Sequence, residues 1–111
     1  MRSYLIQEIS TQDMLRITEG INQKAYKTPM ESLFWITLPE ELLTPEQKKH
    51  SDQCGPHYLA LETGEDWVKL ELLIRCERKI RCDCISYATP EQREYMIDFL
   101  DQTIRNQDVS V

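Results

Sequence analysis

The sequence contains few of the patterns that identify a chemical activity. Its only glycines are at positions 20, 55 and 64, so it has no glycine-rich loop for binding phosphates. With two histidines, His50 and His57, and no G-x-S-x-G motif, it offers little support for a Ser-His-Asp triad. We assign no catalytic residue, and the sequence favours a protein that is not an enzyme.

Basic residues and long apolar runs are also scarce. The 13 Lys and Arg residues are outnumbered by 19 Asp and Glu, and the net charge of −6 argues against a nucleic-acid partner. No apolar run approaches the roughly 20 residues of a membrane span, so we expect no membrane partner. The N-terminal ten residues lack the apolar core and cleavage site of a signal peptide. We therefore expect a cytoplasmic protein with four reduced cysteines and no cofactor.

The length and composition are those of one globular domain. A chain of 111 residues, 41% of them hydrophobic, can bury a core without disulfides or metal. We expect one domain over residues 1–106 and a loose C-terminal tail over residues 107–111.

Periodicity and helix-start residues predict an α+β fold. Strands are expected at residues 3–9, 32–38 and 57–62 and within 67–87, where the chain must turn near Glu77 to Ile80. Helices are expected at residues 11–25, briefly after Thr44 with an end near His50, and from Thr89 to about Asn106. The predicted order is β-α-β-(short α)-β-β-β-α, a mostly antiparallel sheet of about five strands with two main helices packed on one face.

The letters TPEQ occur twice, at 44–47 and 89–92, in unrelated surroundings. We interpret them as two independent uses of the same helix-start chemistry and not as an internal repeat.

Residues 67–87 alternate regularly between two faces. One parity is small and apolar, and we expect it to face the helices: Val68, Leu70, Leu72, Ile74, Cys76, Ile80, Cys82 and Cys84. The other parity combines large apolar and basic side chains, a composition enriched at protein contacts: Trp67, Lys69, Leu73, Arg75, Lys79, Arg81, Ile85 and Tyr87. We expect this second face, called here the predicted docking face, to bind a protein partner or a second copy of the chain. The primary functional prediction is therefore a small cytoplasmic interaction or regulatory module, with a homodimer as one form.

Three of the four cysteines fall within "CERKIRCDC", residues 76–84. Their shared parity with Leu70 and Ile74 favours buried core cysteines, because free cysteine behaves as a small hydrophobe. Two alternatives stay open. One is a disulfide bond between Cys82 and Cys84 or between Cys76 and Cys82. The other is a metal site that draws on His50, Cys54, His57, Cys82 and Cys84.

The stretch Cys54-Gly-Pro-His57 resembles the Cys-Gly-Pro-Cys active site of thioredoxin-like proteins, with His57 in place of the second cysteine. The resemblance covers four residues and implies a reactive Cys54 thiol activated by His57. Ordinary Gly-Pro turn chemistry explains the same letters. The alternative functional prediction is therefore a thiol- or metal-dependent protein that uses Cys54 and His57 with His50.

Overall fold

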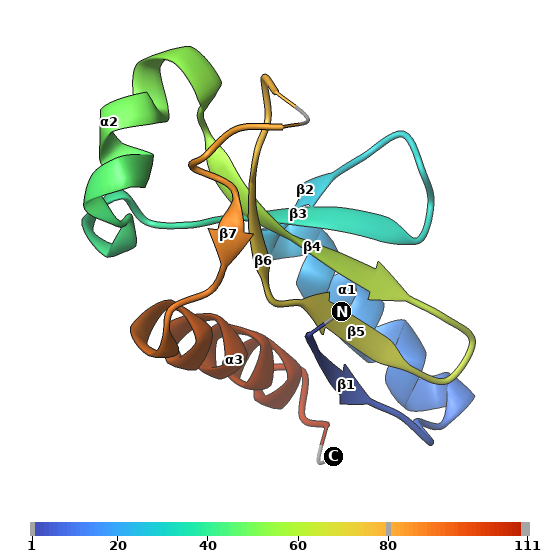
Figure 1. The fold of residues 1–111 in the computed structure, drawn as a ribbon. Coiled ribbons are helices and arrows are strands. Elements are labelled where there is room, and N and C mark those ends of the chain that lie inside the picture. Colours follow the sequence, from blue (N-terminus) through green and yellow to red (C-terminus); the bar gives the residue numbers. More distant parts are fainter. Residues whose placement is uncertain (1, 80, 110–111) are drawn as a thin grey trace.

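The computed structural model describes residues 2–79 and 81–109. Short segments in which apolar and polar residues alternate form one antiparallel sheet (Figure 1). The strands are β1 (Ser3–Ile6), β2 (Tyr26–Lys27), β3 (Leu33–Thr37), β4 (His57–Thr63), β5 (Val68–Glu71), β6 (Leu73–Cys76) and β7 (Ser86–Tyr87). The strand order is β1-β5-β4-β3-β2, while β6 pairs with β4 and with β7. The helices are α1 (Thr11–Lys24), α2 (Pro45–Cys54) and α3 (Pro90–Arg105), with a 3-10 turn η1 (Glu40–Leu42) before α2. The predicted α+β class and the mostly antiparallel sheet are confirmed.

One face of the sheet packs against α1 and α3, as predicted. Met14, Ile17 and Ile21 of α1 are buried in the same apolar cluster as Met96 and Leu100 of α3. The cluster continues into alternate sheet residues such as Phe34, Leu59, Leu61, Leu70 and Ile74. In the part of the chain that the structure describes, no helix has the length and apolarity needed to cross a bilayer.

The predicted long strand after Trp67 is interrupted at Leu72. Leu61 of β4 pairs with Leu70 of β5, and Tyr58 of β4 pairs with Arg75 of β6. Two residues of β4 therefore lie opposite four residues, 71–74, of the β5–β6 segment. This two-residue bulge preserves side-chain parity, so Val68, Leu70, Leu72, Ile74 and Cys76 are all buried as predicted. It also redirects β6, which pairs with β7 as well as with β4.

The prediction that the chain returns from the turn as a long strand is wrong. Of the described residues after the turn, only Ser86 and Tyr87 pair with β6. Residues 77–79 and 81–85 form an irregular segment, called here loop 77–85. Cys82 and Cys84 therefore lie in a loop and not on a strand face. Ile80, which was expected at the turn and on the buried parity, lies outside the described residues.

The helix α1, which ends at Lys24, runs through Gly20. A Cβ atom at this position would lie 2.8 Å from Cγ of Gln107, so the absence of a side chain lets the C-terminal segment approach the helix. Val109 is 4% exposed and belongs to the core. These two residues of the expected loose tail therefore pack on the domain.

The two TPEQ segments begin α2 and α3, each with a full capping box, as the helix-start residues predicted. The structure adds a direct contact between them, although they are far apart in sequence. Gln92 Nε2 donates hydrogen bonds to Gln47 Oε1 at 3.0 Å and to the Leu42 carbonyl at 2.8 Å. Both glutamines are at most 1% exposed, so a buried amide pair joins the N-termini of the two helices.

We predict that Gln92→Ala lowers the free energy of unfolding by about 2 kcal/mol, because it removes a capping-box acceptor and leaves the partly buried Leu42 carbonyl without its donor. Gln102→Ala is the matched control, an exposed glutamine on the same helix, and should change stability by less than about 0.5 kcal/mol. Urea unfolding followed by circular dichroism measures both. Equal effects of the two substitutions would contradict a structural role for the amide pair.

Candidate metal centre

The helix α2 extends one full turn beyond its predicted end and includes Cys54. It starts at Pro45 after the N-cap Thr44, and the amide of Gly55 closes it by donating to the Ser51 carbonyl at 3.0 Å. His50 and Cys54 are therefore one helical turn apart, at the i and i+4 positions that share a face. Because the helix was expected to end near His50, the sequence did not place these two side chains together.

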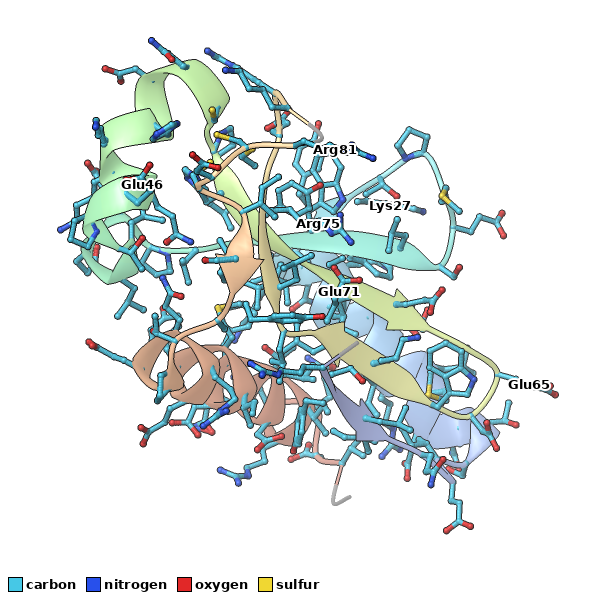
Figure 2. All side chains as sticks on the ribbon, viewed as in Figure 1. Lys27, Glu46, Glu65, Glu71, Arg75 and Arg81 are labelled. Atoms are coloured by element: carbon cyan, nitrogen blue, oxygen red, sulfur yellow. The ribbon has the colours of Figure 1, made fainter. Side chains whose placement is uncertain are left out.

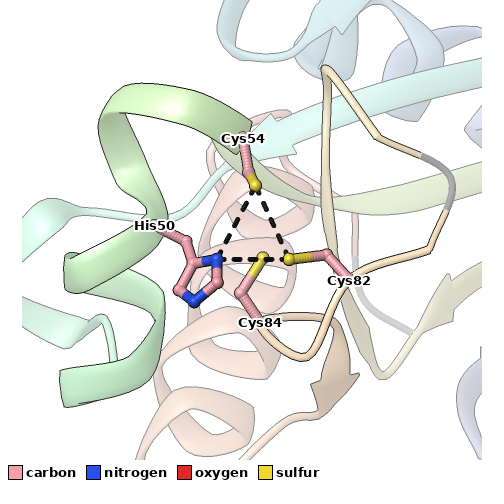
Figure 3. A group of neighbouring side chains, drawn as sticks. All are labelled: His50, Cys54, Cys82 and Cys84. Carbon is pink, nitrogen blue, oxygen red and sulfur yellow. Dashed lines mark hydrogen bonds between the residues drawn. The ribbon is translucent and has the colours of Figure 1, made fainter.

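Loop 77–85 brings Cys82 and Cys84 to the same place (Figure 3). Backbone hydrogen bonds fix the start of the loop on the C-terminal end of α2: Arg78 N donates to the Cys54 carbonyl at 3.0 Å, and Glu77 N donates to the Pro56 carbonyl at 3.1 Å. Farther along, Gln47 Nε2 donates to the Cys84 carbonyl at 3.3 Å. The loop thus contacts α2 near both ends of the helix.

Four potential metal ligands converge here, and we call them the cysteine–histidine cluster: His50, Cys54, Cys82 and Cys84. Their ligand atoms all lie within 4.8 Å of one another. Cys54 Sγ is 3.6 Å from Cys82 Sγ and 3.9 Å from His50 Nδ1, and Cys82 Sγ is 3.3 Å from His50 Nδ1 (Figure 3). Zn–S bonds of about 2.3 Å and a Zn–N bond of about 2.0 Å give tetrahedral edges of roughly 3.8 Å for S···S and 3.5 Å for S···N. The three distances match these edges to within about 0.4 Å.

The other ring nitrogen of His50 faces a carboxylate. His50 Nε2 lies 2.9 Å from Glu46 Oε1, again one helical turn away on α2. A proton on Nε2 donated to Glu46 leaves the Nδ1 lone pair directed at the three sulfurs. Metal-ligating histidines almost always carry such an outer carboxylate or carbonyl partner. Figure 2 labels Glu46 on α2.

The pKa values of the three thiols in the cluster are shifted in different directions. Hydrogen bonds from the backbone and thiol of Cys84, with a smaller effect of Cys54 and His50, lower the pKa of Cys82 to about 7. Burial raises the pKa of Cys84, and so do the neighbouring Cys82 and Cys76. Burial also raises the pKa of Cys54, as does its contact with Cys82. Cys82 is thus the thiol of the cluster that loses its proton most readily, whereas a cation would have to displace the protons of Cys54 and Cys84.

The predicted partnership of Cys54 with His57 does not form in the described structure. Cys54 is fully buried and contacts His50 and Cys82, while His57 pairs with Cys76 across β4 and β6. Both ring nitrogens of His57 are buried without a hydrogen-bond partner. The metal alternative therefore keeps four of its five predicted residues and loses His57.

None of the four cysteines forms a disulfide in this structure, and their reduced state in the cell stays a prediction. Cys76 is buried, and its thiol donates to the Lys79 carbonyl at 3.3 Å. The prediction of inward-facing cysteines is therefore correct for Cys76 and Cys84, whereas Cys82 is only half-buried. A signal for the metal site was present in the sequence, since Glu46, His50 and Cys54 recur every four residues.

The predicted docking face is divided among several environments. On β5 the ammonium of Lys69 lies 5.6 Å from the ring centre of Trp67, and on β6 the guanidinium of Arg75 pairs with Glu71 at 2.7 Å (Figure 2). Lys79 and Arg81 are exposed on loop 77–85, and Tyr87 is 40% exposed on β7. Half-buried Leu73 lies opposite Tyr87, whereas half-buried Ile85 packs against the buried cysteines. Binding of a partner by this face stays a prediction.

Comparisons with protein-family models, with curated proteins and with solved structures found no match to this chain.

We predict that His57 makes stability depend on pH. Burial, with a smaller effect of His50, lowers the pKa of His57 below its ordinary value of 6.5. Below about pH 6.5 the His57 ring is protonated in the unfolded chain but stays neutral in the folded chain. The free energy of unfolding therefore falls as the pH drops below about 6.5. His57→Leu removes that proton and the unpartnered ring nitrogens, and should raise stability at pH 7 by about 1 kcal/mol.

Urea unfolding between pH 7 and pH 5 tests this prediction. The loss of stability over that interval should be smaller in His57→Leu than in the wild type. Parallel curves for the two proteins would contradict the assignment of an uncharged, unpartnered His57.

Proposed function

We propose that this protein is a zinc-binding domain in which one structural zinc ion at the cysteine–histidine cluster holds loop 77–85 against α2. The observation that carries the proposal is the convergence of three sulfurs and His50 Nδ1 within 4.8 Å. Three thiolates and one imidazole are ligands that zinc prefers, and four protein ligands complete its tetrahedral shell. A complete shell supports a structural ion, since catalytic zinc sites keep a position open for water or substrate.

The helix α2 supports the proposal because it has no apolar stripe that would hold it on the core. Its buried residues are Gln47 and Cys54, so it presents no apolar stripe to the core. A metal ion bound to His50 and Cys54 supplies an attachment that apolar burial does not.

Zinc binding is compatible with the predicted interaction module. The ion fixes the shape of a loop whose exposed Arg78, Lys79 and Arg81 are available to an acidic partner. The reducing conditions of the cytoplasm, where we place the protein, keep the thiols available for metal. We propose this role in binding over an enzymatic one.

Metal content tests the proposal directly. Protein purified without chelator should contain one zinc per chain by mass spectrometry of the metal. Cys84→Ser and Cys82→Ser should each lower that content severalfold. Cys76→Ser is the matched control, because Cys76 is a neighbouring buried thiol outside the four ligands. Equal loss in Cys76→Ser and Cys84→Ser would contradict the ligand assignment, and one iron in place of zinc would contradict the choice of metal.

Glu46 allows a finer prediction. Glu46→Ala should weaken zinc affinity by about 10-fold, because it removes the acceptor that orients His50. Glu91→Ala is a close control, since Glu91 is an exposed acid at the same position of the second TPEQ helix. Competition with a coloured chelator measures both affinities. Equal weakening by the two substitutions would assign the effect to the helix dipole and overturn the positioning role of Glu46.

A further inference from the structure

The strand β1 forms one edge of the sheet and leaves backbone groups open (Figure 1). The amide of Leu72 donates to the Arg2 carbonyl at 3.0 Å, and the register continues with Tyr4 opposite Leu70 and Ile6 opposite Val68. In an antiparallel ladder such hydrogen-bonded pairs alternate with pairs whose backbone groups point the other way. The N–H and C=O groups of Ser3 and Leu5 therefore point toward the open edge.

This edge has none of the usual protection against pairing. Edge strands are commonly blocked by a proline, a charged side chain or a bulge, and Ser3–Ile6 contains none of these. Leu5 is 47% exposed at its centre. The opposite edge, β2, has only two residues and includes Lys27.

A hollow lies beside β1 on each face of the sheet. On the helix side, a hollow of about 440 Å³ is lined by Tyr4, Leu5, Ile6, Asp101, Ile104, Arg105 and Val109. A second hollow, of about 280 Å³, is lined by Leu5, Gln7, Trp67 and Lys69. Because successive side chains of a strand point to opposite faces, a strand added to β1 directs them toward both hollows in turn.

The sequence of β1 is complementary to itself. In an antiparallel pair of two β1 strands centred on Leu5, Tyr4 lies opposite Ile6 of the other copy. Ser3 lies opposite Gln7, just beyond the end of β1. Arg2 of one copy and Glu8 of the other flank the paired strands, since Glu8 has a left-handed backbone with φ 60° and Arg2 lies over the ring of Tyr87. Opposite charges thus come near each other at both ends of the pair without facing directly across the ladder. In the same register the two Leu5 residues form a hydrogen-bonded pair. This agrees with the orientation of the Leu5 N–H and C=O groups, which point toward the open edge.

We propose that two copies of this chain pair through β1 in this register, so that their sheets join across a twofold axis at Leu5. The exposed Leu5 side chains then become neighbours, and Trp67 of each copy, the residue just before β5, lines the hollow beside Leu5. This surface includes Trp67 and Lys69 of the predicted docking face but places its centre on β1. The pairing is independent of the proposed zinc ion, whose ligands lie on α2 and loop 77–85.

Sedimentation velocity from low to high micromolar concentration tests the proposal. The wild type should show a monomer–dimer equilibrium, and Leu5→Lys should raise the dissociation constant at least about tenfold by adding a charge to the edge. Leu15→Lys makes the same change at a 70% exposed leucine of α1 and should leave the dimer intact. Zinc content should be the same in all three proteins, which separates this test from that of the metal centre.

Charge reversal tests the register. Arg2→Glu and Glu8→Arg should each weaken dimerisation at low salt, and the double variant should recover it. Hydrogen exchange adds a backbone measurement, since the Leu5 amide should become more protected as concentration rises while the Tyr4 amide, already paired with β5, should not. A wild type that stays monomeric, a Leu5→Lys variant that dimerises like the wild type, or failure of the double variant to recover would overturn the proposal.

Discussion

Loop 77–85 is fixed mainly by its attachment to α2, and the arrangement of this end of the molecule depends on that attachment. The described residues of the loop form no strand before Ser86 and Tyr87, and α2 buries only Gln47 and Cys54. Neither segment has an apolar surface large enough to order it alone. The cysteine–histidine cluster lies where the two segments meet.

The molecule thus has two kinds of interior. Between the sheet and the pair α1 and α3, apolar side chains such as Ile17, Leu70 and Met96 exclude water, and no special chemistry is needed. Around α2 the buried and half-buried groups are polar: the Gln47–Gln92 amide pair at the N-terminus, and one histidine with three thiols toward the C-terminus. Buried polar groups are stable when their bonding is complete. The glutamines bond to each other and to carbonyls, and the proposed zinc ion would complete the bonding of the sulfurs.

The sequence predicted the apolar part of the fold well, because periodicity reports burial directly. The strand alternation from Val68 to Cys76, the capped start of α3 and the placement of both long helices on one face were all correct. The polar part was harder to predict. The C-terminal end of α2 contacts a loop 24 residues later in the sequence, through the hydrogen bond from Arg78 N to the Cys54 carbonyl, and the bulge at Leu72 arises from how β4 pairs with two strands.

The candidate site shows the same limit. Residue type and spacing suggested His50, Cys54, Cys82 and Cys84 as possible ligands, together with His57, but pattern alone favoured core cysteines. The structure distinguishes the four candidate ligands from His57. His50 and Cys54 share one face of α2 with Glu46, and loop 77–85 brings Cys82 and Cys84 to that face, whereas His57 lies apart without a hydrogen-bond partner. X-ray absorption at the zinc edge of the purified zinc-loaded chain tests the central claim most directly. The account predicts three sulfur neighbours at about 2.3 Å and one nitrogen at about 2.0 Å. A shell of oxygen and nitrogen alone, or one of four sulfurs, would contradict it.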